Sequence, residues 1–114
     1  MIKIRLFCAA GMSTSILSEK MNEAAKIKGI EADIKAFPKS RLSRHLQGVD
    51  IVLLGPQIRH SFTSISKVCK TEGVPVEVIS NTDFRRMDGV KTLEFALRII
   101  KNNKFFKENK FSYF

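Results

Sequence analysis

The segment that decides the fold is a strand that runs through a loop of small residues into a helix. It spans residues 2–15 and has the sequence Ile2-Lys3-Ile4-Arg5-Leu6-Phe7-Cys8-Ala9-Ala10-Gly11-Met12-Ser13-Thr14-Ser15. Residues 2–7 alternate apolar and basic side chains and then become apolar, which predicts a strand. Beyond the loop, apolar side chains recur at three- and four-residue steps as far as Gly29, which predicts a helix: Leu17, Met21, Ala24 and Ala25.

Outward from this unit, further apolar runs alternate with stretches of helical periodicity. Strands are predicted over residues 30–37, 51–54 and 74–79, with Pro38 closing the second strand and Pro75 tolerated near the start of the fourth. The run Ile51-Val52-Leu53-Leu54 is continuously apolar, as expected for a strand that is covered on both faces of a parallel sheet.

Helices are predicted between these strands and after the last one. Residues 39–46 predict a short basic helix. The apolar face of the next helix ends at Gly73 and comprises Ile58, Phe62, Ile65, Val68 and Cys69. The apolar face of the last helix comprises Val90, Leu93, Ala96, Leu97 and Ile100. This alternation predicts an α/β fold, in which right-handed crossovers connect the strands of a parallel sheet.

Composition limits the classes of protein to which the chain can belong. At 114 residues it has room for one domain, and 44% apolar with 27% charged residues is typical of a soluble globular protein. No apolar run approaches the roughly 20 residues of a transmembrane helix, and the charged amino terminus does not resemble a signal peptide. The two cysteines, Cys8 and Cys69, cannot form a disulfide framework or a zinc cluster, so we expect free thiols in a reducing cytoplasm. The net charge of +9 favours anionic partners.

The loop after the first strand has the features of an anion-binding site. Ligands of an open parallel sheet bind beyond the carboxyl ends of the strands, and this loop lies at such an end. Small residues there let backbone N–H groups close around an ion of the size of phosphate: Ala9, Ala10 and Gly11. Hydroxyl donors follow at Ser13, Thr14 and Ser15. The dipole of the helix adds partial positive charge at the same place.

Cys8 stands at the mouth of this loop. A helix N-terminus and converging N–H donors stabilise a thiolate, and the same groups would stabilise a phosphoryl group bound to the sulfur. Cys8 is therefore suited to attack phosphorus and to carry the phosphoryl group covalently. The alternative interpretation is that Cys8 is only a small residue that ends a buried strand. The spacing of the loop favours the functional interpretation.

The loop also resembles that of a known family. Residues 6–15 closely resemble the phosphocysteine loop of enzyme IIB components of the bacterial phosphotransferase system, in the lactose, cellobiose and chitobiose class. The resemblance continues through Glu31-Ala32, Ala36-Phe37-Pro38, Asp50-Ile51-Val52-Leu53-Leu54-Gly55-Pro56-Gln57-Ile58, Val74-Pro75-Val76-Glu77-Val78-Ile79 and Met87-Asp88-Gly89. It extends from Ile2 to Lys101, and the combination of the cysteine loop with Leu54-Gly55-Pro56-Gln57 is specific.

The resemblance implies both a fold and an activity. It implies one three-layer domain over residues 1–101, flavodoxin-like and similar to small tyrosine phosphatases, with four parallel strands in the order 2-1-3-4 flanked by helices. Cys8 would accept a phosphoryl group from a phosphohistidine of enzyme IIA and pass it to a β-disaccharide held by the membrane enzyme IIC. Residues Ala9 to Ser15, Met12 included, would form the phosphate loop. We expect no metal, no cofactor and a cytoplasmic location, at the inner face of the membrane when the protein is docked to enzyme IIC.

Other functions match the sequence less well. A low-molecular-weight cysteine phosphatase or an arsenate reductase has an arginine six residues after its cysteine, and here that position is Thr14. A flavodoxin needs side chains that flank the flavin ring, but the chain has no Trp and its single tyrosine is Tyr113. A receiver domain needs an aspartate at the end of the third strand, where Gly55-Pro56 stands instead. Because no recognition helix or aromatic platform accompanies the basic charge, nucleic-acid binding is not expected.

Several reactive side chains have simpler structural interpretations. We interpret His45 and His60 as surface or capping residues rather than phosphoryl acceptors, because neither lies in a comparable loop. Cys69 fits the apolar face of its helix as a small core residue. Gln57 and His60 follow the third strand and are candidates to border the site.

The residues after the fourth strand give less information about function. Asp83 and Asp88 follow the fourth strand and are candidates to cap the last helix or to contact a partner. Residues 102–114 are basic and aromatic and lie outside the resemblance. Their lysines and aromatic residues spread around every side of a helical projection, so we interpret them as a frayed tail rather than as a membrane or partner contact.

Overall fold

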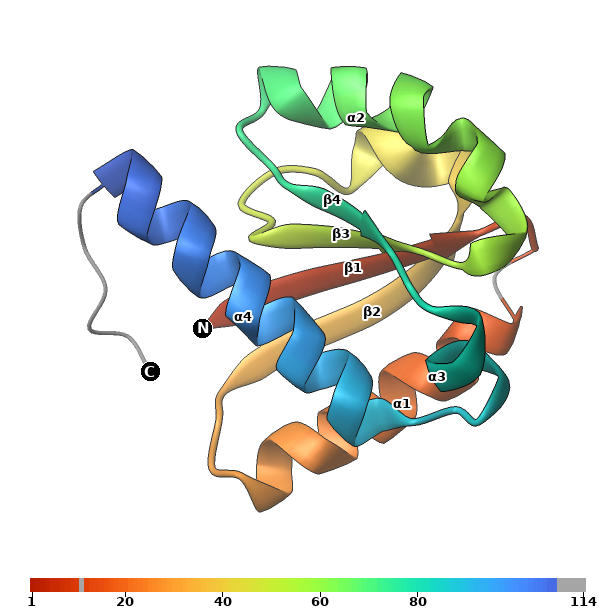
Figure 1. Cartoon of the computed structure of the whole chain (residues 1–114), viewed down its shortest axis with the longest axis vertical. Coiled ribbons are helices and arrows are strands. Elements are labelled where there is room, and N and C mark those ends of the chain that lie inside the picture. The colour runs from red at the N-terminus through yellow and green to blue at the C-terminus, as the bar shows by residue number, and fades with distance from the viewer. Residues whose placement is uncertain (11, 109–114) are drawn as a thin grey trace.

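A parallel sheet with the strand order β2-β1-β3-β4 forms the middle layer of the protein (Figure 1). The computed structural model describes residues 1–10 and 12–108, the last five by their backbone alone. The strands are Ile2–Cys8 (β1), Ala32–Pro38 (β2), Ile51–Leu54 (β3) and Val76–Val78 (β4), and all neighbouring pairs are parallel. The predicted strand order is confirmed, and β3 has the bounds that its apolar run predicted.

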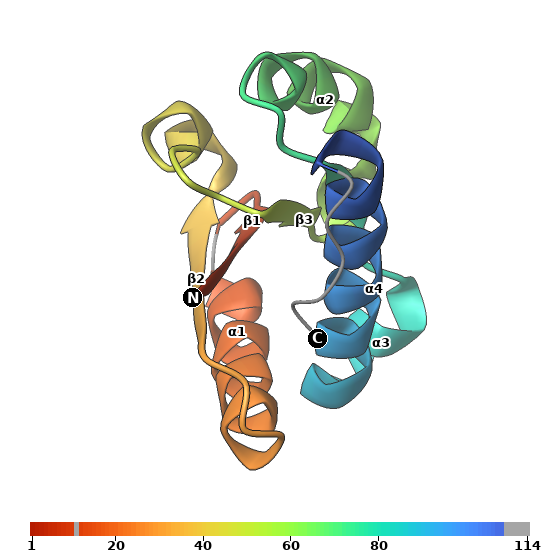
Figure 2. The same ribbon diagram turned by 90° about the vertical axis from the view of Figure 1, so that its left-hand side faces the viewer.

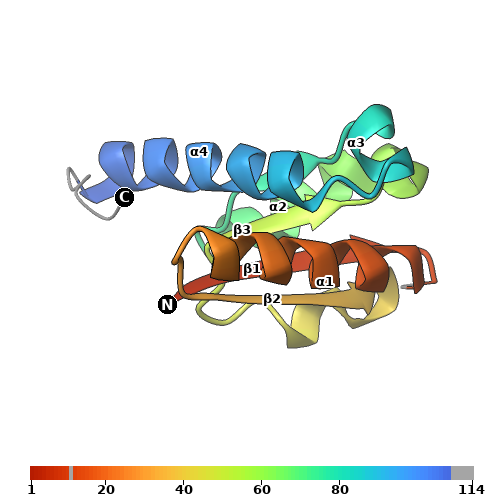
Figure 3. The same ribbon diagram turned by 90° about the horizontal axis from the view of Figure 1, so that it is seen from below.

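Helices cover both faces of the sheet. They are α1 (Met12–Ile27), η1 (Lys39–Arg44), η2 (Pro56–Ser61), α2 (Phe62–Thr71), α3 (Asn81–Arg85) and α4 (Gly89–Glu108), of which η1 and η2 are 3₁₀ helices. Figures 2 and 3 show α1 and α4 together on one face, and Figure 2 shows α2 on the other. The predicted three-layer α/β architecture is therefore correct.

The alternation of side chains along β1 divides the core into two clusters. Ile4 and Leu6 point to the face covered by α1 and α4, where they pack with Leu17, Met21 and Leu93. Phe7 points to the other face, where the second cluster includes Leu42, Val52, Ile58, Ile65 and Cys69. Because β3 contributes Ile51 and Leu53 to one cluster and Val52 and Leu54 to the other, every residue of this strand is apolar.

Two helices end in the same way, at a glycine with a positive φ. Gly29 after α1 and Gly73 after α2 both have φ of 71°, a left-handed conformation that glycine adopts without steric cost. The next residues, Ile30 and Val74, donate backbone hydrogen bonds of 2.8 Å and 3.0 Å to carbonyls five residues earlier in the helix. This arrangement is a Schellman motif, and it returns the chain to the sheet at the amino-terminal ends of β2 and β4.

Gly89 lets α4 approach the backbone of α1. A Cβ added at Gly89 would lie 2.5 Å from the carbonyl carbon of Lys20 and 2.6 Å from its oxygen. Only a residue without a Cβ fits there, so the glycine fixes the contact between the two helices on this face.

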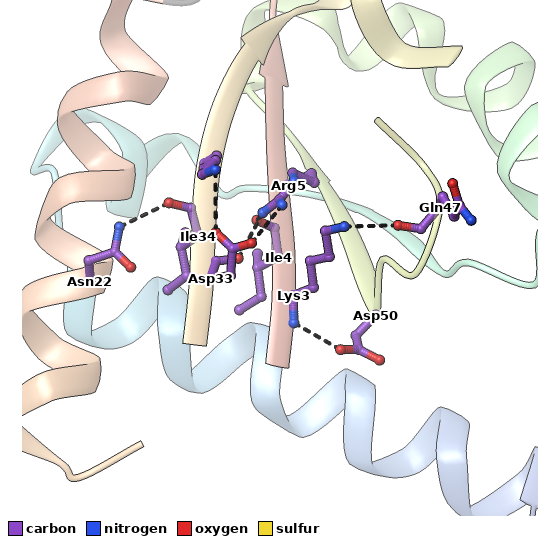
Figure 4. A network of polar contacts seen from close by, with 9 residues as sticks. Lys3, Ile4, Arg5, Asn22, Asp33, Ile34, Gln47 and Asp50 are labelled. Carbon is purple, nitrogen blue, oxygen red and sulfur yellow. Dashed lines mark hydrogen bonds and ion pairs between the residues drawn. The ribbon is translucent and has the colours of Figure 1, made fainter. Parts of the chain in front are cut away.

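Charged side chains hold the first strand to its neighbours (Figure 4). The Arg5 guanidinium is buried in spite of its charge, and it donates to the carboxylate of Asp33 at 2.9 Å and to the Asp33 carbonyl oxygen at 2.8 Å. At the other edge of β1, the backbone N–H of Lys3 donates to the Asp50 carboxylate at 2.9 Å. Lys3 Nζ also donates to the carbonyl oxygen of Gln47 at 3.0 Å. These bonds fix the amino-terminal half of β1 between β2 and β3.

The structure differs from the sequence predictions at several element boundaries. The helix expected over residues 39–46 is a 3₁₀ helix over Lys39–Arg44. The fourth strand is shorter than predicted because the N–H of Val74 donates to Cys69 in the preceding turn. The predictions also omitted α3, whose N-cap Ser80 accepts a 3.0 Å hydrogen bond from the N–H of Asp83.

Three apolar residues predicted on buried helix faces are exposed instead. Phe62 is 37%, Val68 is 44% and Val90 is 47% exposed. On α2, the side chains that reach the core are Ile65 and Cys69, one helical turn apart, and Val68 lies about 100° away from Cys69 around the helix. Val90 lies beside Gly89, the residue by which α4 contacts α1.

Helix α4 continues across the predicted domain end at Lys101 and ends at Glu108. Neither glycine nor proline occurs between Val90 and Glu108, so the backbone has no reason to leave the helix where the apolar face ends. Seven residues assigned to the tail therefore belong to α4. The remaining part of the predicted tail, residues 109–114, lies outside the described residues.

Candidate functional site

Cys8 is the last residue of β1 and lies at the carboxyl end of the sheet. It pairs in register with Pro38 of β2, and the carbonyl of the preceding Phe7 accepts a 2.8 Å hydrogen bond from the N–H of Gly55 after β3. The cysteine is therefore held from both neighbouring strands. Its side chain is 5% exposed, so the sulfur stands at the base of the loop rather than on the surface.

Thr14 provides a polar partner for the thiol. Its Oγ1 lies 3.3 Å from Cys8 Sγ, and either atom can act as donor. Thr14 is fully buried in the first turn of α1, although the sequence analysis treated it as one hydroxyl among three. The i to i+6 spacing from the cysteine across a tight loop is the signal that could have identified this pair.

The rest of the predicted phosphate loop is open to solvent. Ala9, Ala10, Met12, Ser13 and Ser15 are exposed, and Gly11 lies outside the described residues. Helix α1 begins at Met12, so the helix N-terminus faces the loop as predicted. An anion that entered this loop would therefore meet the sulfur at its base and the start of α1 beside it.

Gly55 forms the wall of the site on the β3 side. A Cβ added there would lie 3.3 Å from the Cβ of Cys8 and 2.7 Å from Oε1 of Gln57. The side chain of Gln57 therefore borders the cysteine, as its position after the third strand suggested. It also lines a pocket of about 540 Å³ together with Asn81, Phe84, Arg85 and Met87.

A larger apolar pocket of about 730 Å³ lies elsewhere, at the amino-terminal end of the sheet. Met1, Ile30 and Leu97 are among the residues that line it. Because strands β1 and β2 begin at that end and Cys8 ends β1, this pocket does not belong to the site around the cysteine.

Within the part of the chain that the structure describes, no three His, Cys, Asp or Glu side chains gather in a way that could hold a metal ion. Among the helices of the described residues, none is sufficiently long and apolar to cross a membrane.

Comparison with known proteins identifies the family. The family model named "PTS system, Lactose/Cellobiose specific IIB subunit" matches residues 3–95, which include Cys8, the loop and, apart from Ile2, all four strands. The chain belongs to this family of phosphotransferase-system IIB components.

Individual relatives agree with this assignment. This IIB component is 37% identical over 102 residues to the oligo-beta-mannoside-specific EIIB component of Bacillus subtilis (strain 168), a match that covers 90% of the chain and 99% of the relative. It is 39% identical over 98 residues to the galactose-specific EIIB component of Lactococcus lactis subsp. cremoris (strain MG1363), a match that covers 82% of this chain and 91% of the relative. The solution structure of the cellobiose-specific phosphotransferase IIB component of Borrelia burgdorferi superposes with a TM-score of 0.75 at 38% sequence identity. The superposition covers 90% of this chain and 94% of that structure.

The family places the protein among the sugar-specific phosphotransfer components for lactose- and cellobiose-type sugars. It is thus a component of a transferase that functions in sugar transport together with other components of the phosphotransferase system. The three relatives are named for different sugars, so the family assignment leaves the individual sugar open. The phosphatase alternative receives no support, since position 14 carries the Thr14 hydroxyl that contacts Cys8.

The second thiol of the IIB component, Cys69, lies in the core. Cys69 is fully buried in the cluster beneath α2, as predicted for a small core residue. Burial raises the pKa of Cys69 to about 11, because a thiolate there would lose its hydration. Cys69 is therefore a neutral thiol near neutral pH.

The two histidines of the IIB component have different surroundings. The ring of His45 stacks on Phe37 with a centroid separation of 3.6 Å and an interplanar angle of 8°. Burial lowers the pKa of His45, and the nearby cations Arg5, Arg41, Arg44 and Lys3 lower it further. His60 is exposed in η2. His45 is the C-cap of η1, where its backbone N–H donates to the carbonyl of Leu42, in agreement with the capping role expected for it.

The two aspartates after β4 have separate roles. Asp88 caps α4, since its carboxylate accepts a 3.0 Å hydrogen bond from the N–H of Lys91. Asp83 lies in the short helix α3 and caps no part of α4. The capping alternative is thus confirmed for Asp88, whereas for Asp83 the other alternative, contact with a partner, stays a prediction.

Proposed function

We propose that Cys8 of this IIB component accepts a phosphoryl group from a phosphohistidine of enzyme IIA and transfers it to a sugar presented by the membrane enzyme IIC. The loop from Ala9 to Ser15 binds the phosphoryl oxygens in this proposal. The sugar is a β-disaccharide of the cellobiose, chitobiose or lactose type. The protein acts in the cytoplasm and reaches the inner face of the membrane when it docks to enzyme IIC.

The observation that carries the proposal is the position of the Cys8 sulfur. It lies at the carboxyl end of β1, where the chain enters the N-terminus of α1, and 3.3 Å from the Thr14 hydroxyl. A hydroxyl in contact with sulfur can donate to a thiolate, which stabilises the nucleophilic form. The N-terminus of α1 favours negative charge at the same place, both on the sulfur and on a bound phosphoryl group.

The first transfer exchanges one bond to phosphorus for another. The Cys8 thiolate attacks the phosphorus in line, the S–P bond forms, and the P–N bond to the donor imidazole breaks. The imidazole nitrogen keeps the electron pair of that bond. In the second transfer, a sugar hydroxyl attacks phosphorus and releases its proton to water, while the S–P bond breaks and the sulfur keeps the electron pair of that bond as the thiolate.

The state of the second cysteine supports Cys8 as the acceptor. Cys69 is sealed in the core and its pKa is raised to about 11, so it supplies neither an accessible sulfur nor a thiolate at neutral pH. Cys8 borders an exposed loop at the end of the sheet, which is where ligands of parallel α/β proteins bind.

The decisive experiment is intact-mass and site mapping after incubation with phosphorylated enzyme IIA. We expect the mass of one phosphoryl group, acid-labile and mapped to Cys8. A Cys69→Ser variant should accept the same group, and a Cys8→Ser variant should accept none while keeping the circular-dichroism spectrum of the wild type. Phosphorylation of the Cys8→Ser protein would disprove the assignment.

A second measurement separates the carrier from a phosphatase. The wild type should release little phosphate from a small aryl phosphate, because a relay has to protect its phosphoenzyme from water. Steady turnover of that substrate, together with an unlabelled protein after exposure to enzyme IIA, would favour the hydrolytic alternative.

A further inference from the structure

The positive charge of this protein is concentrated in two parts of the sequence, residues 34–70 and residues 101–114. Residues 34–70 contain seven Lys and Arg residues and one acidic residue, Asp50. In residues 1–33 and 71–100, by contrast, basic and acidic residues nearly balance. The carboxylate of Asp50 is bonded to the N–H of Lys3 at the start of β3, at the opposite end of the sheet from Cys8. The single acidic residue of the middle segment therefore lies at the end of the sheet opposite to Cys8.

Two short helices bring part of this charge next to the cysteine. Helix η1 starts directly after Pro38, which pairs in register with Cys8. Helix η2 starts directly after Gly55, whose added Cβ would lie 3.3 Å from the Cβ of Cys8. A 2.9 Å hydrogen bond from Lys39 Nζ to Ser61 Oγ ties η1 to η2. The starts of both helices therefore lie near the cysteine, and the hydrogen bond joins the two helices into one connected wall.

The exposed cations of this wall form what we call the basic rim: Lys39, Arg41, Arg44 and Arg59. Neither η1 nor η2 contains an acidic residue, so these four cations make the wall basic, as an anionic partner requires.

We propose that the basic rim is the docking surface for an acidic face of phosphorylated enzyme IIA, which it orients with the phosphohistidine over Cys8. This inference rests on the proposed function, because it names the surface by which the phosphoryl donor approaches the same cysteine. A phosphoryl group carries about −1.5 to −2 charge at neutral pH, so the donor is more strongly attracted when it is loaded than when it is empty. The rim thus favours binding before transfer and release after it.

A donor protein fits the rim better than a membrane surface does. A protein that binds at the starts of η1 and η2 lies next to Cys8, because Pro38 pairs in register with Cys8 and Gly55 lies beside it. The phosphohistidine donor has to cover Cys8 in order to react, whereas lipid headgroups in that position would block it. Steering by opposite charge raises association rates by about 10- to 1,000-fold and weakens as salt is added.

Exposed apolar side chains on the other side of the loop complete such a surface. Met12 is 79% and Ile16 is 50% exposed on the first turns of α1. An apolar centre with a charged border is the usual composition of a transient protein interface. In this arrangement the rim sets the rate of encounter, which depends on salt, and the apolar residues set the lifetime of the complex, which does not.

The test is the second-order rate constant for transfer from phosphorylated enzyme IIA to Cys8, measured by rapid quench and mass spectrometry over a range of salt concentrations. The rim variant is Arg41→Glu/Arg44→Glu. The matched control is Lys67→Glu/Lys70→Glu, which makes the same change of charge at exposed positions of α2. We expect the rim variant to be slower by about tenfold or more at low salt and the control to stay within about twofold of the wild type. High salt should reduce the difference, because screening shortens the range of the attraction.

Each result has a distinct meaning. Failure of the wild type to accept a phosphoryl group would overturn the proposed function itself. A wild type that is phosphorylated at the same rate as both double variants would overturn only the docking surface. A rim variant that keeps its transfer rate but no longer binds vesicles containing phosphatidylglycerol would also overturn the docking surface, because the rim would then be a lipid-binding surface. The milder Arg41→Gln/Arg44→Gln variant gives the same comparison if charge reversal prevents folding, with a smaller decrease expected.

Discussion

The sulfur of Cys8 lies 3.3 Å from the hydroxyl oxygen of Thr14, and this contact closes the loop between β1 and α1. Cysteine phosphatases have an arginine at the position of Thr14, where its guanidinium clamps the phosphoryl oxygens for hydrolysis. A threonine can donate a hydrogen bond to the thiolate without adding a positive charge for water attack. The pair therefore suits a protein that has to hold a phosphoryl group until it is passed on.

Removal of the Thr14 hydroxyl should slow phosphorylation of Cys8. Thr14→Val keeps the shape of the fully buried side chain but leaves the thiolate without this donor. We expect the rate of transfer from phosphorylated enzyme IIA to fall by about tenfold, the equivalent of about 1.4 kcal/mol. The measurement is a rapid-quench time course of the phosphorylated protein.

Thr14→Ser is the matched control, because it keeps the hydroxyl and removes only a methyl group. Its transfer rate should remain within about threefold of the wild type. Equal rates for the valine and serine variants would mean that the hydroxyl plays no part in the transfer.

The ion pair between Arg5 and Asp33 makes stability depend on pH. The hydrogen bond from Arg5 lowers the pKa of Asp33 in the folded protein, so the ionised carboxylate is stabilised. This stabilisation is complete above the pKa of an unfolded aspartate, about 3.9, and disappears as the pH falls through the lowered pKa of the folded state. Asp33→Asn should therefore cost about 1–2 kcal/mol at neutral pH and almost nothing in strong acid.

Urea unfolding at neutral pH and at several acidic values tests this prediction. Lys35→Gln serves as the comparison, since Lys35 reaches the same carboxylate only at 4.0 Å and is largely exposed. Lys35→Gln should lower the free energy of unfolding by less than Asp33→Asn does at neutral pH. An Asp33→Asn variant whose loss of stability does not shrink in acid would contradict the assignment of the effect to this ion pair.

Gly89→Ala should destabilise the protein without affecting the chemistry. The new Cβ would lie 2.5 Å from the backbone of Lys20, and backbone atoms cannot move aside as a flexible side chain does. We expect a loss of about 1–3 kcal/mol in the free energy of unfolding, seen as a lower Tm. Lys91→Ala, at an exposed position of the same helix, should change stability by less than about 0.5 kcal/mol. An unchanged Tm for Gly89→Ala would show that α4 can shift away from α1 at no cost.

Cys69 should resist thiol reagents until the protein unfolds. It is fully buried, and burial raises its pKa to about 11, so the folded protein offers no thiolate at this position near neutral pH. Iodoacetamide should leave Cys69 unmodified in buffer and label it completely in urea, as measured by peptide mapping. Rapid labelling in buffer would indicate that the layer under α2 opens on the time scale of the reaction.

The parts of the fold that were predictable are those with a strong period or a sharp interruption. The run Ile51–Leu54 gave the bounds of β3, because a strand buried on both faces has no polar positions and Gly55-Pro56 stops it. Gly29 and Gly73 likewise marked helix ends, since a left-handed residue is needed where the chain turns back.

The parts that were not predictable depend on contacts between distant segments. The five residues of α3 are too few to show a helical periodicity of apolar residues. The N-cap Ser80 is the one feature of the sequence that indicates this helix. Arg5 looks like a solvent-facing strand residue, and its burial follows from Asp33, which lies 28 positions away. The pairing of Cys8 with Thr14 also joins two segments, the end of β1 and the start of α1, and the six-residue spacing across the loop is its only trace in the sequence.

The Schellman turns at Gly29 and Gly73 lie at the amino-terminal ends of β2 and β4, whereas the proposed transfer and docking use the carboxyl ends. The protein can therefore be attached to a support at the amino-terminal ends of its strands while the carboxyl ends stay accessible. A tether attached at the exposed residue Glu72, next to one of these turns, would leave the cysteine facing solution. Immobilised in this way, a single molecule would allow repeated cycles of loading and unloading to be counted one at a time.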